Sequence, residues 1–197
     1  MIPKFTKLDK QPNKKDVSES SIVYDGHIKV IQYKDYEFVS EPHMVIILPY
    51  LRDEGYVLLR HESVPTYQYH YKDVDDYKNI THFLTCISGT VEKGETLQNA
   101  VRRELYEETG IVLSSMYQVD INKSLFVSKG NSSQYHICLL ELRYNDFRLT
   151  KAPGDGTESE KKSRTVKISL GDLDNLRTHD LITDYIVTKF KLEYKLK

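Results

Sequence analysis

The residues best suited to chemistry in this sequence are three acids that follow Arg103. Glu104 comes directly after it, and Glu107 and Glu108 lie about one helical turn further along. Residues three and four apart share one side of a helix, so the three carboxylates are predicted to line one edge. Like charges at this spacing repel one another, and carboxylate oxygens are the ligands that Mg²⁺ and Mn²⁺ prefer. The spacing therefore predicts a divalent-cation site, with Arg103 orienting one acid through paired hydrogen bonds.

The sequence around the acids contains the signals that would position them. Thr96 is a suitable N-cap, because its hydroxyl can accept from the free amides of a first helical turn. Gly110 stands where a helix commonly ends in a left-handed residue. Between the two, apolar residues with helical spacing predict one buried face. This stripe consists of Leu97, Ala100, Val101 and Leu105. We therefore expect a helix with one side in the core and another side carrying the acids.

This segment resembles the signature of the Nudix hydrolase family at every fixed position. The matching residues are Gly89, Glu95, Arg103, Glu104, Glu107, Glu108 and Gly110, with Leu105 and Ile111 at the two apolar positions. The resemblance implies a fold of the α/β class, an α/β/α sandwich around a mixed β-sheet. It also implies an enzyme that hydrolyses the diphosphate bond in a nucleoside diphosphate linked to another moiety X.

The resemblance implies roles for the residues of the motif. Arg103 would hold the acids in place, Glu95 would brace the loop, and Glu107 and Glu108 would be catalytic together with Arg103. Mg²⁺ or Mn²⁺ would neutralise the phosphates and acidify a bound water. The metal ligands would be Glu104, Glu107, Glu108 and a backbone carbonyl of Ser88 or Gly89.

Composition and charge narrow the class of protein. The 197 residues, 39% hydrophobic and 29% charged, suit one soluble domain with a small appendage. The net charge of −1 gives no overall basic field, so long nucleic acid is not an expected partner. Cys86 and Cys138 lie in apolar runs and are predicted to be reduced core residues, which favours a cytoplasmic location. No secretory signal and no membrane-spanning run are evident, so no membrane association is expected.

Two parts of unequal size are predicted along the chain. Residues 1–42 would form a basic tail and a β-hairpin extension, and residues 43–197 would form the Nudix domain. Strand-like runs on both sides of Asp25-Gly26 predict the hairpin, and 36–39 would add a third strand. The extension is either a simple β-appendage or a dimerisation module that reaches the active site of a neighbouring subunit. We expect a homodimer.

Apolar runs predict the strands and the closing helices of the domain. The strands are expected at 43–50, 56–60, 82–88, 124–128, 134–144 and 165–170, and an irregular loop at 145–164. His136 is expected to be an ordinary strand residue, because one histidine on an alternating strand is a weak signal for a ligand. A short helix would open at Ser169 or Gly171, and Asp180 would cap a final amphipathic helix. Its buried stripe is predicted at Leu181, Ile182, Tyr185, Ile186 and Phe190, with a polar break at Lys189.

Outside the motif, the chain resembles the ADP-ribose and nucleotide-sugar pyrophosphatase branch of the family. The hairpin sequence VYDGHIKV and the strand pair that ends in Arg60 carry this resemblance. The strand before Gly89 departs from it, since Thr85-Cys86-Ile87-Ser88 stands where the branch has Glu-Leu-Pro-Ala. The branch implies substrate contacts by Arg60 and Gly89 and a general-base glutamate on the loop 145–164. The candidates for that base are Glu158 and Glu160, with Asp155 behind them.

Substrate identity stays open at this point. Tyr67 and Tyr69, in a tyrosine-rich segment, could stack on a base, although a surface loop with half-buried tyrosines is the plainer interpretation. ADP-ribose or a nucleotide sugar is the favoured substrate. Alternatives are NADH, coenzyme A, a dinucleoside polyphosphate or an RNA cap. A nucleotide-binding sensor without catalysis is a further alternative, but such proteins usually lose acids from the helix and none is missing here.

Overall fold

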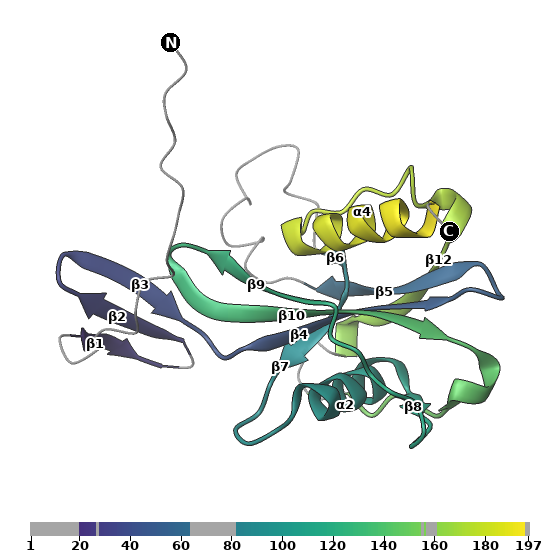
Figure 1. Ribbon diagram of the computed structural model, residues 1–197, viewed down its shortest axis with the longest axis horizontal. Coiled ribbons are helices and arrows are strands. Elements are labelled where there is room, and N and C mark those ends of the chain that lie inside the picture. Colours follow the sequence, from purple (N-terminus) through teal and green to yellow (C-terminus); the bar gives the residue numbers. More distant parts are fainter. Residues whose placement is uncertain (1–19, 27, 64–81, 155, 157–160, 196–197) are drawn as a thin grey trace, which may run out of the picture. The chain divides into compact units, whose positions relative to one another are not determined.

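The computed structural model describes residues 20–26, 28–63, 82–154, 156 and 161–195 (Figure 1). The chain divides into two compact units. Unit 1 consists of residues 1–41 and 128–132, and unit 2 of residues 42–127 and 133–197.

Unit 1 is built on an antiparallel meander of β1 (Ser20–Asp25), β2 (Lys29–Tyr33) and β3 (Tyr36–Ser40). The predicted hairpin and third strand are therefore confirmed. The turn is longer than the two residues that Asp25-Gly26 predicts, because Asp25 pairs with Lys29 and leaves three residues between the strands. The amide of Gly26 donates to the carbonyl of Ile28 at 3.1 Å and closes this wider turn.

Unit 2 is organised around a mixed sheet with the strand order β10-β4-β5-β12. The strands are β4 (Met44–Leu51), β5 (Tyr56–Ser63), β9 (Lys123–Ser128), β10 (Asn131–Leu142) and β12 (Arg164–Ser169). β10 runs parallel to β4, whereas β5 pairs antiparallel with both β4 and β12. β9 also pairs with β10. The registers place Thr165 opposite Arg60, a pairing that matters for the site.

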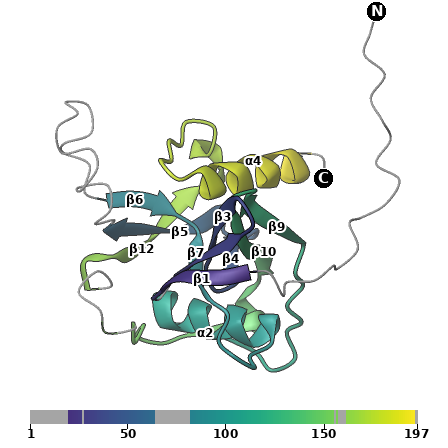
Figure 2. The same cartoon turned by 90° about the vertical axis from the view of Figure 1, so that its left-hand side faces the viewer.

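Helices cover both faces of this sheet. α2 (Leu97–Thr109) lies on one face and α4 (Leu181–Lys195) on the other (Figures 1 and 2). The run of apolar residues in β4 serves both layers, because successive side chains alternate between the faces. Val45 and Ile47 pack in the core under α2, and Ile46 and Leu48 pack in the core under α4. The predicted α/β/α sandwich around a mixed sheet is therefore confirmed.

The run 82–88 does not form the single strand that its apolar sequence predicts. β6 (His82–Thr85) pairs with β5, and β7 (Ile87–Thr90) pairs with β4. Cys86 separates them, and its amide donates to the hydroxyl of Thr183 at 2.8 Å rather than to a neighbouring strand. This side-chain bond from α4 lets the chain change partners without leaving a buried amide unpaired.

The final helix begins where predicted but buries only part of the predicted stripe. Asp180 caps it, since its carboxylate accepts from the amide of Thr183 at 2.8 Å. Leu181 is 78% exposed, contrary to the prediction. The cap fixes the rotation of the first turn and directs Thr183 toward Cys86, so Leu181 faces solvent. The buried residues are Thr183, Ile186, Val187 and Phe190. Among the described residues, no helix combines the length and apolar character needed to cross a membrane.

The prediction of an irregular loop at 145–164 is wrong for its first residues. A 3-10 turn, η2 (Tyr144–Asp146), leads into β11 (Phe147–Leu149), which pairs antiparallel with β8 (Ile111–Leu113). A strand of three residues is too short for a periodic signal, and it forms because β8 offers an open edge after Gly110. The predicted short helix near Ser169 is present as one 3-10 turn, η3 (Leu170–Asp172), which Ser169 caps.

Two smaller predictions about polar core residues are confirmed. Cys86 and Cys138 are buried and free, with 1% and 0% of their surfaces exposed. His136 is 8% exposed, and its Nδ1 lies 2.7 Å from the hydroxyl of Ser124. It is a satisfied strand residue of β10.

Candidate active site

α2 holds its acids in place through its two ends and its apolar face. The hydroxyl of Thr96 accepts from the amide of Asn99 at 3.2 Å, which confirms the predicted N-cap. Gly110 ends the helix at φ 75° and ψ 7°, the left-handed conformation predicted for it. Val101 and Leu105 are completely buried and fix the rotation of the helix about its axis. This rotation draws two acids of the motif, Glu104 and Glu108, to 8% and 9% exposure.

Arg103 joins three carboxylates. Its Nε and Nη2 donate to the two oxygens of Glu95 at 3.1 and 3.0 Å. Its Nη1 donates to Glu104 at 2.5 Å and to Glu107 at 3.2 Å. Nη2 also donates to the carbonyl of Thr90 in β7 at 2.7 Å. The bonds from Arg103 lower the pKa of Glu95, and the guanidinium thereby fixes the loop before α2 to the acids on the helix.

Glu104 lies directly against the backbone of β7. A Cβ atom on Gly89 would be 1.8 Å from its carboxyl carbon, so no other residue fits at this position without displacing the acid. Burial raises the pKa of Glu104 to about 7, although Arg103 counteracts that effect. Ser88 and Gly89 are neighbours in β7, so their carbonyls belong to the strand that Glu104 approaches.

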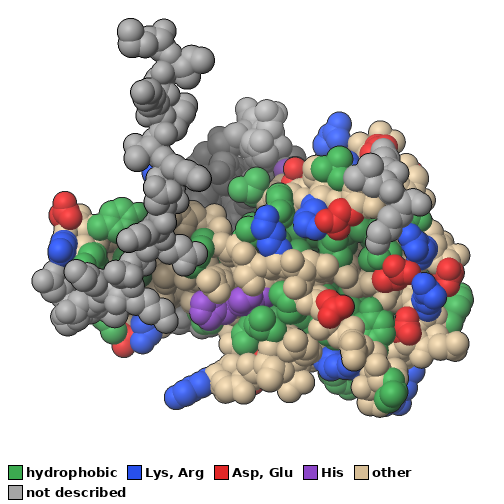
Figure 3. Space-filling view, in the orientation of Figure 1, with side chains coloured by type: hydrophobic (Ala, Val, Ile, Leu, Met, Phe, Trp, Pro, Cys, Tyr) green, Lys and Arg blue, Asp and Glu red, His purple; other side chains and the backbone are tan. Residues whose placement is uncertain are grey.

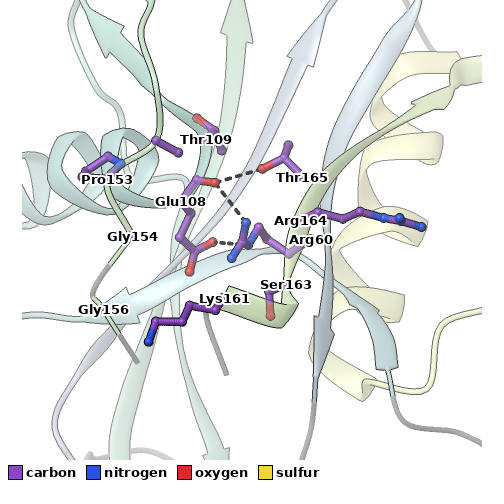
Figure 4. A pocket seen from close by; sticks show the side chains of 11 residues that line it. Arg60, Glu108, Thr109, Pro153, Gly154, Gly156, Lys161, Ser163, Arg164 and Thr165 are labelled. Carbon is purple, nitrogen blue, oxygen red and sulfur yellow. Dashed lines mark hydrogen bonds and ion pairs between the residues drawn. The ribbon is translucent and has the colours of Figure 1, made fainter. Parts of the chain in front are cut away.

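Glu108, near the C-terminal end of α2, is held by Arg60 (Figure 4). Arg60 Nε lies 3.3 Å from the carboxylate, and Nη1 donates to the backbone carbonyl of Glu108 at 3.0 Å. The hydroxyl of Thr165 donates to the same carbonyl at 3.0 Å. Carbonyls in the last turn of a helix lack intrahelical partners, and a cation there is favoured by the helix dipole. Arg60, only 2% exposed, therefore stabilises both the acid and the helix end.

A cavity of about 460 Å³ opens beside this pair. One side is formed by Ala152, Pro153, Gly154 and Gly156, and the other by β5 and β12. The amide of Gly154 donates to the carbonyl of Glu107 at 3.0 Å, which joins the loop to α2. Figure 4 shows Lys161 extending below Glu108, whereas the guanidinium of Arg164 points away.

The charge distribution over unit 2 is mixed. In the face shown in Figure 3, Lys and Arg side chains are interspersed with Asp and Glu. This pattern agrees with the net charge of −1 of the whole sequence.

The comparison with protein families decides the identity of this arrangement. A family model described as the NUDIX domain matches residues 42–178, which include the whole motif and the cavity beside it. The chain belongs to the Nudix family. The resemblance found in the sequence is confirmed at this level.

Individual relatives of this Nudix chain are distant. The oxidized purine nucleoside triphosphate hydrolase of Danio rerio is 30% identical over 73 residues, which are 37% of this chain and 41% of that protein. The chain thus matches less than half the length of this relative. A crystal structure of an ADP compounds hydrolase has a TM-score of 0.62 at 18% identity, covering 90% of this chain and 91% of that one. A MutT structure from a study of Aliivibrio salmonicida and Vibrio cholerae has a TM-score of 0.47 at 17% identity, covering 75% and 98%. The structural similarity to the ADP compounds hydrolase supports the assignment of the Nudix fold.

The structure divides the acids of the predicted Nudix site into two groups. Arg103 gathers Glu95, Glu104 and Glu107, while Glu108 is held separately by Arg60. In the part of the chain that the structure describes, no three acid, histidine or cysteine side chains are grouped so that they could share one metal ion. The predicted edge of three carboxylates is therefore occupied by two guanidinium groups.

Five other predicted residues lie outside the described residues. These are Tyr67, Tyr69, Asp155, Glu158 and Glu160. Gly156 and Lys161, which flank the last two of them in sequence, both line the cavity. Thr165 and Lys161 also belong to the site and were not predicted from the sequence. The only signal for Thr165 is its position in a strand that pairs with Arg60, and such a pairing is not encoded locally.

Proposed function

We propose that this Nudix protein is a divalent-metal-dependent pyrophosphohydrolase. Its substrate would be a nucleoside diphosphate linked to another moiety, with ADP-ribose or a nucleotide sugar as the favoured case. The observation that carries the proposal is the arrangement of the motif acids. Arg103 holds Glu95, Glu104 and Glu107 together, and Arg60 holds Glu108 at the wall of a cavity. A solvated acidic helix would have no need for such buried, shared contacts.

The residues present fit a hard divalent cation such as Mg²⁺ or Mn²⁺. Glu104, Glu107 and Glu108 provide carboxylate oxygens. Glu104 also lies against Gly89, so backbone carbonyls of β7 are near its carboxylate. The raised pKa of Glu104 marks a buried acid whose charge a cation would stabilise. When bound, the cation would neutralise phosphate charge and acidify a water. Since Arg103 and Arg60 hold these acids in this structure, at least one acid must exchange a guanidinium contact for the metal.

The cavity beside Glu108 would receive the diphosphate. Lys161 extends into the region below Glu108 and provides positive charge at its wall (Figure 4). Arg60 was expected to contact substrate, and its buried position on Glu108 favours a role in positioning that acid. A glutamate between Gly156 and Lys161, either Glu158 or Glu160, is our proposed general base.

The reaction needs one water and no other co-reactant. The water oxygen attacks one phosphorus, the bond from that phosphorus to the bridging oxygen breaks, and the bridging oxygen leaves on the other phosphate. The proton of the water passes to the general base. The products are a nucleoside monophosphate and the phosphorylated second moiety.

A second candidate substrate is a nucleoside triphosphate. The matching segment of the Danio rerio oxidized purine nucleoside triphosphate hydrolase favours it, at 30% identity over 73 residues. The chemistry of bond cleavage would be the same, so the two candidates differ only in what the protein recognises.

Location and oligomeric state are parts of the same proposal. We propose a cytoplasmic protein, which the two free, buried thiols support. We also propose a homodimer formed through unit 1. Three successive apolar side chains of β1, those of Ile22, Val23 and Tyr24, are 55–58% exposed, and a second copy would cover them.

The test is a substrate panel with purified full-length chain. It contains ADP-ribose, nucleotide sugars, NADH, coenzyme A, dinucleoside polyphosphates, an RNA cap analogue and nucleoside triphosphates, each with Mg²⁺ or Mn²⁺. Glu107→Gln and Glu108→Gln are expected to lower kcat by about 100-fold or more. The loss of a metal ligand and the loss of a proton-transfer group each slow catalysis by about this factor. Glu193→Gln, at an exposed acid of α4, is the matched control and should leave kcat unchanged.

Two results would contradict the proposal. Near wild-type rates in both Glu107→Gln and Glu108→Gln would overturn the metal-site assignment. Nucleotide binding without hydrolysis of any panel member would establish the sensor alternative instead. Circular dichroism of each variant separates loss of catalysis from loss of fold.

A further inference from the structure

A second and larger cavity adjoins the first within unit 2. It has a volume of about 600 Å³ and lies between the strands β5 and β12 of the main sheet and the small β8–β11 sheet. Thr109 and Thr165 line both cavities and therefore form the wall between them. The hydroxyls of these threonines are engaged with backbone carbonyls of α2, so the wall is held by the helix that carries the acids.

The floor of the second cavity is apolar. Leu58 and Ile111 are 6% and 2% exposed, and Phe147 packs against the same core. These residues come from β5, β8 and β11, so the floor is assembled from separate parts of the chain. An apolar floor of this kind is suited to the face of a ring.

The rim of the second cavity presents both donors and acceptors. Hydrogen bonds from Tyr56 and Tyr144 lower the pKa of Glu54, so the rim carries an ionised carboxylate between two hydroxyls. Lys167 Nζ lies 4.3 Å from the centroid of the Tyr56 ring and adds a cation to the same rim. The four groups come from the turn after β4, from β5, from η2 and from β12.

We propose that this second cavity binds the heteroaromatic base of the nucleotide substrate. A nucleobase has two apolar faces, which the floor accommodates, and an edge of N–H donors and carbonyl or ring-nitrogen acceptors, which Glu54, Lys167 and the tyrosines match. The inference rests on the proposed function, because the diphosphate in the first cavity brings the base to the shared wall at Thr109 and Thr165. A volume of about 600 Å³ falls in the usual range of small-molecule sites.

Other ligand classes fit the second cavity less well. A purely apolar chain would strip water from the charged rim without replacing its hydrogen bonds. A second phosphate group would meet the carboxylate of Glu54 at the rim and an apolar floor beneath it. A ring with a polar edge satisfies both surfaces at once.

The first experiment locates the ligand directly. The full-length protein with labelled leucine and isoleucine methyl groups is titrated with AMP, GMP, CMP and UMP while methyl NMR spectra are recorded. We expect shifts at Leu58, Ile111 and Leu149, which line the cavity, and none at Leu192, which is exposed on α4. Shifts confined to other methyl groups would overturn the inference.

The second experiment blocks the cavity at its mouth. Leu149 is 71% exposed, so Leu149→Trp is expected to fold normally and to fill the entrance. It should weaken nucleoside monophosphate binding by about 10-fold. It should also raise KM for the substrate with a smaller effect on kcat, because the lost contacts are with the base and not with the reacting phosphates. Leu192→Trp, at a leucine that is 62% exposed, is the matched control and should change neither quantity.

A third experiment tests the rim with two variants. Lys167→Met and Glu54→Gln remove one donor and one charged acceptor, so they should alter the ranking of the four nucleotides while the melting temperature stays within the range of the controls. An unchanged ranking together with unchanged affinity in Leu149→Trp would overturn the inference. If nucleotides bind in this cavity but no panel substrate is hydrolysed, the proposed function fails and the base site stands.

Discussion

Arg103 holds the carboxylates of Glu95, Glu104 and Glu107 with a single planar group. The forked guanidinium makes this possible, since it offers five donors in fixed directions. One of its partners is buried and has a pKa raised to about 7, so the arginine also supports a charge that burial disfavours. At the scale of the single residue, the site pairs buried or half-buried acids with guanidinium groups.

We predict that Arg103→Lys disables the enzyme while the fold persists. Lysine keeps the charge but cannot donate to Glu95 through two atoms and also reach Glu104 and Glu107. We expect kcat to fall by about 100-fold, comparable to the loss of a positioning group. Arg143→Lys is the control, because Arg143 is 64% exposed and contacts Glu141 on the surface. Equal kcat values for the two variants would show that the positive charge alone is sufficient.

Gly89→Ala tests the close approach of β7 to Glu104. The new Cβ would be 1.8 Å from the Glu104 carboxyl carbon, so the acid must move and we expect a loss of about 1–3 kcal/mol in the free energy of unfolding. Adding Glu104→Ala should restore most of that stability without restoring activity. Gly130→Ala serves as the control, because the nearest atoms to its Cβ are at 3.9 Å. Urea denaturation measures all four proteins.

At the scale of the element, the sequence predicts those features that depend on neighbours along the chain. The N-cap Thr96, the C-terminal Gly110 and the buried face of α2 are local signals, and all three are confirmed. The division of 82–88 into β6 and β7 was not predictable, because it depends on a bond from Cys86 to a residue 97 positions away. The cap by Asp180 directs Thr183 of α4 toward this bond.

We predict that Thr183→Val destabilises the junction between the sheet and α4. Thr183 is 1% exposed, and its hydroxyl accepts from the Cys86 amide at 2.8 Å and donates to Asp180 at 2.6 Å. Valine has the same shape but leaves the buried amide unsatisfied, which costs about 1–3 kcal/mol. Thr188→Val, on an exposed position of the same helix, should stay within about 0.5 kcal/mol of wild type. Similar unfolding free energies for both variants would contradict this role.

At the scale of the whole molecule, the buried thiols report on global unfolding. Burial raises the pKa of Cys86 and of Cys138 to about 12, so neither forms a thiolate at neutral pH in the folded chain. The apolar runs around the two cysteines predicted that they are reduced core residues. It could not predict that they lie in different layers, Cys86 in the core under α4 and Cys138 in the core under α2.

Thiol reagents should therefore detect only the unfolded protein. At pH 8 we expect 5,5′-dithiobis(2-nitrobenzoate) to label neither cysteine of the native chain and both in urea. Ser115→Cys, at an exposed position, is the positive control and should add one rapidly reacting thiol. Because the folded-state pKa values are raised, the stability that the neutral thiols contribute is complete below about pH 9 and declines above it. Rapid labelling of the native wild type would contradict the burial of both residues.

The assembly of the cavities is the property of the whole molecule that the sequence reveals least. Arg60, Glu108 and Thr165 are distant along the chain, and Arg60 and Thr165 lie outside the motif. They meet because β5 and β12 pair in one register and the end of α2 lies against them. The motif identified the acids, while the partners of Glu108 required the three-dimensional arrangement.

The bonds between α2 and the segment after β11 have a kinetic consequence. Thr150 donates to the carbonyl of Gly110 through both its amide, at 2.8 Å, and its hydroxyl, at 3.0 Å, and Gly154 donates to Glu107. At the far end, the hydroxyl of Ser163 accepts from the amide of Ser63 at 3.3 Å. A short tether between two attachment points gives an effective concentration in the millimolar range or above. The general base that we propose on this segment would then meet the attacking water by confinement, and lengthening the segment should slow proton transfer without changing the affinity for substrate.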